Sequence, residues 1–180
     1  MKTMKKFAAL MMLLCALMIV CLLLPCGALA GYNPLTVWTD GRGVAAAFML
    51  GAQGVQVGTR FLVADECTVA EPYKELVLKA KDISTRATGR STGHPVRALK
   101  TRFTNEYAKL EAEGADPDKL AEFGTGALRR AAKDGDVERG SFLCGQVAGM
   151  VRERQSAADI VDDLVSDGEK VLGKAGAWVR

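Results

Sequence analysis

The sequence predicts the end of an α/β barrel followed by a group of helices, so that the chain itself is mostly α-helical. Residues 40–58 have the order helix, tight turn and strand, which is typical of a parallel sheet, and the chain after Gly58 shows only helical patterns. A lone strand cannot satisfy the hydrogen bonds of its own edges. We therefore expect the remaining strands of the barrel to come from sequence outside this chain.

The N-terminus predicts a membrane-directed hydrophobic helix. Lysines precede residues 7–24, a run without charged or strongly polar residues, and Pro25 and the sequence Ala-Leu-Ala of residues 28–30 follow it. This order is typical of a secretory signal peptide, and the run is also close to the length that spans a bilayer. We expect residues 1–30 to be a signal peptide or a transmembrane anchor through residues 7–24, and the protein to be exported or membrane-anchored. A buried core helix, or an artefact of a misjoined reading frame, would also account for this segment.

Residues 40–58 carry the signals that separate a helix from a strand. Asp40 is a suitable N-cap, and the two glycines that follow it let the backbone turn into a helix over residues 44–50. Gly51 is placed to end this helix. The glycine-bounded run at residues 54–58 predicts a short β-strand.

Helical periodicity and end signals predict a series of helices after Gly58. These are residues 73–81 after Pro72, a helix from Pro95 to Gly114, residues 117–124 after Asp116, residues 126–133, residues 141–154, and a final helix from Ser156. The helix from Pro95 carries one apolar stripe: Val96, Leu99, Phe103, Tyr107 and Leu110. The segment 141–154 has small residues on one expected face: Gly145, Ala148 and Gly149. Ser156 with Asp159 resembles a capping box.

Composition excludes several kinds of site. The 24 basic and 21 acidic residues give a net charge of only +3, so we do not expect a nucleic acid as a partner. His94 is the only histidine, which excludes a histidine-rich metal site within this chain. Cys67 and Cys144 lie outside the apolar N-terminus, without zinc-ligand spacing, and a disulfide between them stays open. The apolar neighbours of Cys144 favour a buried, inert side chain.

Several motifs in order resemble one family of flavoenzymes. Residues 40–52 (DGRGVAAAFMLGA) and 54–61 (GVQVGTRF) closely resemble the last two βα units of nitronate monooxygenases, above all the FMN-dependent enoyl-acyl-carrier-protein reductases of type II. Residues 92–97 (TGHPVR) and 140–149 (GSFLCGQVAG) resemble further family motifs in the same order. The similarity runs from about Thr39 to the C-terminus.

This resemblance implies a (β/α)₈ TIM-type barrel with a helical cap, which binds FMN at the C-terminal ends of its strands. Residues 31–66 would be the last βα units of an incomplete FMN-binding barrel, and residues 67–180 the helical cap. The resemblance places the phosphate end of FMN at Gln56, Val57, Gly58 and Thr59. Glycine permits close approach, and a threonine N–H and hydroxyl can both donate to phosphate. Without the resemblance, the residues favour a simpler interpretation, in which Gly58 ends a strand and Thr59 caps a short helix.

The chain also departs from the family pattern. The family has a glycine pair directly before Asp-Gly-Arg-Gly, whereas residues 36–39 are Thr-Val-Trp-Thr here. The first six βα units, which hold the family's catalytic histidine, have no counterpart. His94 is not its equivalent, and we expect it to cap or pack at the start of a helix. Ser141 and Gln146 can pack against the barrel mouth or make an ordinary helix contact.

The family implies an FMN-dependent oxidoreductase. The flavin would pass hydride from NAD(P)H to an enoyl thioester, carried by an acyl-carrier protein or a small molecule, or would oxidise a nitronate with O₂. A homodimer and, for the family, a cytoplasmic location are further expectations. An inactive fragment, or a membrane-tethered or exported helical module that binds a partner, would fit the same residues.

Overall fold

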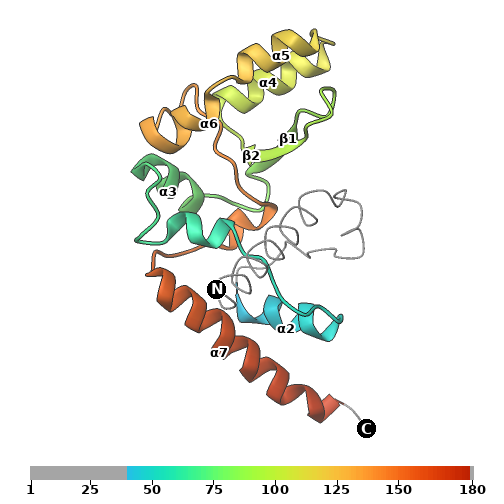
Figure 1. The fold of residues 1–180 in the computed structure, drawn as a ribbon, viewed down its shortest axis with the longest axis vertical. Coiled ribbons are helices and arrows are strands. Elements are labelled where there is room, and N and C mark those ends of the chain that lie inside the picture. The colour runs from blue at the N-terminus through green and yellow to red at the C-terminus, as the bar shows by residue number, and fades with distance from the viewer. Residues whose placement is uncertain (1–39, 179–180) are drawn as a thin grey trace, which may run out of the picture. The chain divides into compact units, whose positions relative to one another are not determined.

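The computed structural model describes residues 40–178, and Figure 1 shows the arrangement of their helices and strands. The predicted hydrophobic segment at residues 1–30 and the Thr-Val-Trp-Thr sequence lie outside the described residues, so a signal peptide or anchor stays a prediction. Among the helices of the described part, none has both the length and the apolar character needed to cross a membrane. The described residues belong to one compact unit, Leu35–Arg180.

The described part is mostly helical, as predicted, with a single two-stranded sheet among residues 40–178. Its elements in order are α2 (Gly41–Met49), the 3₁₀ helix η2 (Thr59–Val63), α3 (Glu71–Leu78), β1 (Thr85–Thr88), β2 (Val96–Leu99), α4 (Arg102–Ala112), α5 (Pro117–Gly124), α6 (Ala127–Arg129) with a π-helical turn η3 (Arg130–Asp134), the 3₁₀ helix η4 (Gln146–Met150), α7 (Ala157–Ala175) and η5 (Gly176–Trp178).

Helix ends follow the sequence signals closely. The carboxylate of Asp40 accepts hydrogen bonds from the backbone N–H groups of Arg42 and Gly43, which caps α2. Asp116 caps α5, and the Ser156 hydroxyl caps α7. Each such cap typically stabilises a helix by about 1 kcal/mol. The predicted helices at residues 44–50, 73–81, 117–124 and 126–133 and the final helix are therefore confirmed.

The predicted strand at residues 54–58 is wrong for this structure. The segment has no strand partner among the described residues, Gly58 has α-region backbone angles, and the family's barrel is not formed within the described residues. Its half-buried Val57 packs instead on an apolar cluster formed by α2 and α7. The Gly58 carbonyl also accepts a hydrogen bond from the Phe61 N–H at 3.0 Å.

The predicted helix from Pro95 is wrong over its first seven residues. Val96–Leu99 forms β2, which pairs antiparallel with β1, and the helix α4 begins only at Arg102. Thr101 caps α4 in a capping box with Thr104, whose hydroxyl also donates to the carbonyl of Leu99 at 2.8 Å. The strand depends on partners far along the chain, which helical spacing cannot reveal.

The predicted helix at residues 141–154 is also wrong. Residues 141–144 run along β2, where the Leu99 N–H donates to the Phe142 carbonyl at 2.9 Å and the Cys144 N–H donates to the Arg97 carbonyl at 3.2 Å. Only Gln146–Met150 is helical, as the 3₁₀ helix η4. A Cβ on Gly149 would lie 2.7 Å from the Asp82 nitrogen. The small residues therefore mark close approach of the chain to itself rather than one face of a helix.

Two apolar clusters form the core. The larger includes Val63, Tyr73, Val77, Phe142 and Val151, and the rings of Tyr73 and Phe142 meet edge to face at 4.9 Å. The smaller joins α2 to α7 through Val44, Ile160 and Leu164. Val63 belongs to the first cluster and the adjacent Ala64 to the second, so the short helix η2 lies where the two clusters meet.

Candidate functional site

The turn at Gly58–Thr59 is the site that the sequence predicts for the phosphate end of FMN. Gly58 precedes η2, and a Cβ added to it would meet no atom of the described residues within 4 Å. Gln56 and Gly58 are exposed, whereas Val57 and Thr59 are half-buried. The turn therefore has open space beside an exposed glycine backbone, and Val57 packs the segment against the apolar cluster between α2 and α7.

Thr59 links the turn to a distant part of the chain. Its hydroxyl oxygen accepts a hydrogen bond from the Gly145 N–H at 2.8 Å. The hydroxyl proton remains free to donate to another acceptor. As the first residue of a 3₁₀ helix, Thr59 also has a backbone N–H without an acceptor inside the helix. Sequence reasoning missed the bond to Gly145, because no local pattern connects two residues so far apart.

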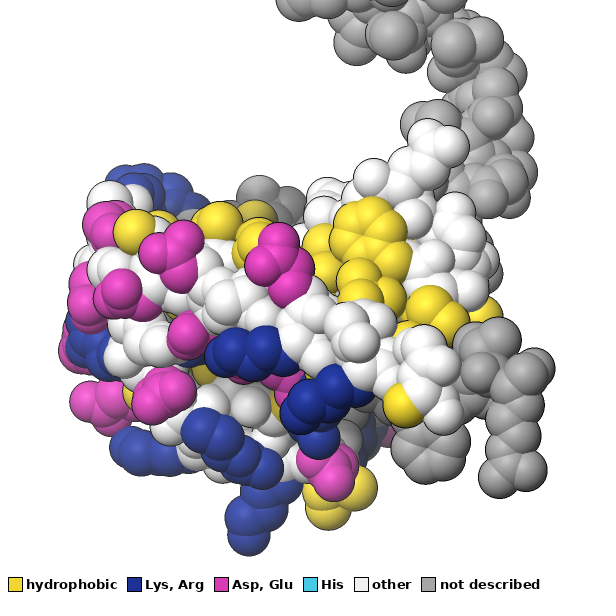
Figure 2. Space-filling model, turned by 90° about the horizontal axis from the view of Figure 1, so that it is seen from below, with side chains coloured by type: hydrophobic (Ala, Val, Ile, Leu, Met, Phe, Trp, Pro, Cys, Tyr) yellow, Lys and Arg dark blue, Asp and Glu magenta, His cyan; other side chains and the backbone are white. Residues whose placement is uncertain are grey.

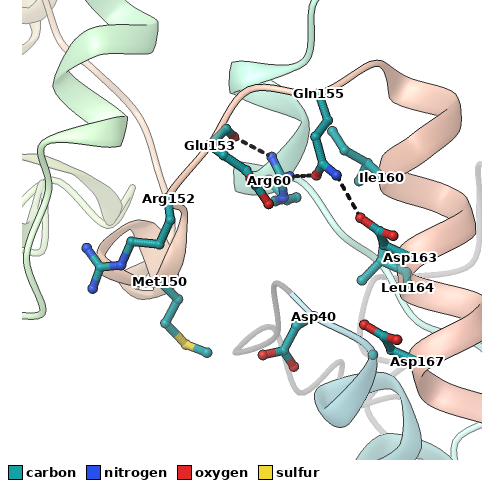
Figure 3. Close-up of a pocket in the computed structure, with 11 residues that line it drawn as sticks. Asp40, Arg60, Met150, Arg152, Glu153, Gln155, Ile160, Asp163, Leu164 and Asp167 are labelled. Atoms are coloured by element: carbon teal, nitrogen blue, oxygen red, sulfur yellow. Dashed lines mark hydrogen bonds between the residues drawn. The ribbon is translucent and has the colours of Figure 1, made fainter. Parts of the chain in front are cut away.

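Arg60 fixes the other side of the turn. Its side chain is 7% exposed, and it donates to the Glu153 carbonyl at 3.0 Å and to the side-chain oxygen of Gln155. The Gln155 amide in turn donates to the Asp163 carboxylate of α7 at 2.7 Å, and Figure 3 shows this chain of contacts. Buried arginines need such partners, because an unpaired buried charge is costly. This network therefore ties η2 to α7.

Lys74 of α3 is a second buried cation that the sequence did not reveal. Its side chain is 3% exposed, and its Nζ donates to the Ala64 carbonyl at 2.6 Å. Because Ala64 directly follows η2, this contact holds the C-terminal end of the same short helix. η2 is thus fixed at both of its ends.

A polar cavity of about 220 Å³ lies beside Arg60 (Figure 3). Its lining includes the carboxyl groups of Asp40, Asp163 and Asp167. Partial burial opposes ionisation of Asp40, but hydrogen bonds from the Arg42 side chain and the Gly43 N–H outweigh it and hold its pKa below the ordinary value. The acidic residues of the lining outnumber its two arginines, Arg60 and Arg152, and Arg60 is already paired, so the net charge disfavours a phosphate in this cavity. A phosphate at the turn would therefore approach Gly58 from its open side.

Three other residues were singled out by sequence, and one of them, Gln146, directly follows Gly145, which donates to Thr59 of this turn. His94 is exposed in the loop between β1 and β2, so the prediction that it stands at the start of a helix is wrong; its N–H donates to the Gly89 carbonyl at 3.1 Å. Gln146 is exposed, and Ser141 is buried beside β2.

The cysteines of the described part form no disulfide, and its cysteines and acidic residues form no metal site. Cys67 and Cys144 are both free thiols, which answers the open question of a disulfide between them. Cys144 is buried as predicted, and burial raises the pKa of its thiol to about 12, which agrees with the expected unreactive side chain. Within residues 40–178, no group of three or more His, Cys, Asp or Glu side chains is placed to hold a metal ion.

Comparisons with known proteins agree with the motifs. The family model for nitronate monooxygenase matches residues 37–167. A probable nitronate monooxygenase of Staphylococcus saprophyticus is 31% identical over 136 residues, which are 75% of this chain and 38% of that protein. The chain thus spans less than half the length of this curated relative.

Solved structures show the same likeness. FabK from Thermotoga maritima has a TM-score of 0.76 and 40% identity, over 80% of this chain and 46% of that one. Nitroalkane oxidase from Streptomyces ansochromogenes has a TM-score of 0.63 and 29% identity, over 78% of this chain and 39% of that one. The resemblance to the oxidoreductases of this group is therefore confirmed, and the chain belongs to the nitronate monooxygenase family.

Proposed function

We propose that this chain forms part of an FMN-dependent oxidoreductase and holds the phosphate end of FMN at Gly58 and Thr59. The observation that carries the proposal is the turn itself, where open space at Gly58 adjoins a threonine with an available N–H and hydroxyl proton. When bound, FMN supplies the redox chemistry, and the protein supplies binding and orientation.

Each residue of the turn has a distinct proposed role. The bare backbone of Gly58 lets phosphate oxygens approach closely, and Thr59 donates to them from its N–H and its hydroxyl. Val57 holds the segment on the core, since it packs against the cluster between α2 and α7. Gln56 is exposed, and only the family resemblance assigns it to the site.

The reaction we propose is one of two that the family implies. One is the oxidation of a nitronate by the flavin, and the other is the NAD(P)H-dependent reduction of an enoyl thioester, free or on an acyl-carrier protein. Residues 40–178 include a two-stranded sheet rather than a barrel. We therefore propose that turnover requires the remaining barrel strands of the family in addition to these residues.

A titration of the purified full chain with FMN tests the proposal. We expect quenching of flavin fluorescence that saturates, and a Thr59→Val variant that binds FMN at least about tenfold more weakly, because it loses a hydrogen bond to a charged group and also the acceptor of the Gly145 N–H. Thr59→Ser keeps the hydroxyl and should bind nearly as the parent does. Thr68→Val is the matched control, because Thr68 is also a threonine, is exposed, and lies nine residues after Thr59, outside the proposed site.

Two results would contradict the proposal. One is a folded protein that takes up no added FMN. The other is equal binding by Thr59→Val and Thr68→Val, which would place the flavin elsewhere. Circular dichroism of each variant separates either result from a loss of folding.

A helical binding module is the second candidate function, and exposed apolar side chains favour it. Phe48, Met49 and Leu50 at the end of α2 are 42%, 66% and 72% exposed. Figure 2 shows hydrophobic side chains gathered on one part of a face where acidic and basic side chains are otherwise interspersed. Such patches often mark interaction sites. A folded, monodisperse protein that binds no FMN would favour this function over the oxidoreductase.

A further inference from the structure

A second concave site lies between α4, α5 and the segment that follows α6. This groove has a volume of about 500 Å³ and shares no lining residue with the cavity beside Arg60. Its volume falls in the range of about 300–1,000 Å³ that small-molecule sites occupy. The groove is therefore large enough for a ligand and independent of the proposed FMN turn.

Three arginines supply the positive charge of the groove. Arg130 is half-buried and uses its Nε to donate to the Arg139 carbonyl at 3.3 Å, while its two terminal nitrogens have no hydrogen-bond acceptor among the described residues. Arg102 and Arg139 are exposed; among the described residues Arg102 pairs with the exposed Glu138, and Arg139 pairs with the half-buried Asp136. Guanidinium groups bind phosphate oxygens with two parallel hydrogen bonds, so Arg130 is well suited to an incoming phosphate.

Two stacked rings form the apolar wall. Phe103 and Phe123 lie parallel, with an angle of 2° between their planes and 5.1 Å between their centroids. Phe103 is buried, whereas Phe123 is half-buried and lines the groove. A planar base can extend this stack, and base–aromatic stacking is worth about 1–3 kcal/mol in nucleic-acid complexes.

Two carboxylates complete the lining and narrow the choice of ligand. Glu106 and Glu138 both face the groove, and Glu138 pairs with Arg102 at 3.0 Å. Negative groups disfavour a bare inorganic anion, but they can accept hydrogen bonds from ribose hydroxyls or from an exocyclic amine. The lining thus combines phosphate donors, a stacking surface and sugar or base acceptors.

We propose that this groove binds a nucleoside phosphate, with the base against Phe123 and the phosphate on Arg130. Arg102 and Arg139 lie where they can exchange their surface carboxylates for phosphate oxygens. The site is separate from the Gly58–Thr59 turn, so its occupancy does not depend on FMN.

Calorimetric titration of the full chain with AMP, adenosine and inorganic phosphate tests the proposal. We expect AMP to bind saturably and more tightly than either of its parts. Arg130→Gln should weaken AMP binding at least about tenfold, since it removes a charge-assisted hydrogen bond. Arg129→Gln is the matched control, because Arg129 is exposed and does not line the groove.

Further ligands identify the source of the phosphate. Adenosine 2′,5′-bisphosphate matches one end of NADPH, and adenosine 3′,5′-bisphosphate matches one end of coenzyme A. Tighter binding of either than of AMP supports the proposal and names that source, and equal binding supports a mononucleotide.

Three outcomes would overturn the inference. They are the absence of saturable binding by all three adenosine phosphates, inorganic phosphate binding as tightly as AMP, and equal binding by the variants at Arg130 and Arg129. Should Arg130→Gln lose its circular dichroism signal, the exposed Arg102→Gln and Arg139→Gln carry the same test. An FMN titration of each variant should be unchanged, which keeps this result distinct from a failure of the flavin site.

Discussion

Replacing Gly41 with alanine introduces a methyl group where α2 and α7 cross without space for it. A Cβ at this position would lie 2.4 Å from the Asp167 Cβ and 2.4 Å from the Gly168 nitrogen, and the second of these is backbone. Carbon contacts are comfortable at about 3.5–4.0 Å, so the helices must separate by roughly 1 Å. That shift opens the cluster in which Val44 packs against Ile160.

The expected cost of Gly41→Ala is about 1–3 kcal/mol, the usual range for forcing atoms into a packed core. Gly173→Ala is the matched control on α7, because a Cβ there would meet no atom within 4 Å in the part of the chain that the structure describes. Alanine is the better helix former by about 1 kcal/mol, so the control should be as stable as the parent or more stable. Urea unfolding followed by circular dichroism measures both. A Gly41→Ala protein as stable as the parent would refute the close crossing of α2 and α7.

Three further predictions concern single residues between Cys67 and Cys144. Hydrogen bonds from the backbone N–H and the hydroxyl of Ser91 are the main cause that holds the pKa of Glu111 below its ordinary value. The ionised carboxylate therefore stabilises the folded chain at pH values above the unfolded pKa. This stabilisation is lost as the pH falls through the lower folded pKa. The protection factors of the amides in the β1–β2 loop, corrected for the intrinsic exchange rate at each pH, should therefore fall as the pH drops below the ordinary glutamate range, and Glu111→Gln should remove this dependence. Cys144→Ser should leave the number of thiols that react rapidly with a disulfide reagent at pH 8 unchanged, whereas Cys67→Ser should lower it by one. Thr104→Val should cost about 1–3 kcal/mol in urea unfolding, because the buried N–H at the start of α4 and a carbonyl of β2 lose their partner.

Helix ends were predictable because their signals are local. Asp40, Asp116 and Ser156 each cap a helix through a backbone N–H no more than three residues away. The sheet was not predictable in this way, because β2 is held by β1 on one side and by residues 141–144 on the other. Helical spacing also fits Val96 and Leu99, and nothing within one turn of the chain distinguishes the two conformations.

In the candidate site, too, local features were predictable from the sequence and long-range contacts were not. The family motif drew attention to Gly58 and Thr59, and their types suit an anion. It did not reveal that Gly145 donates to Thr59, nor that Arg60 is buried against residues 153–155. Those contacts join segments separated by more than eighty residues, so their evidence lies in the fold and not in any stretch of sequence.

These long-range contacts also bear on how the turn keeps its shape. Gly145 holds Thr59 from one side, Arg60 is bonded to residues 153–155 on the other, and Lys74 fixes the carbonyl of Ala64 just beyond η2. All three contacts are made by residues that follow the turn in this chain, namely Lys74, Gly145 and Glu153. The phosphate half of the proposed flavin site therefore rests on residues that this chain supplies. For this reason FMN binding and turnover are separable questions here, and retained FMN binding without turnover would be consistent with the arrangement of these residues.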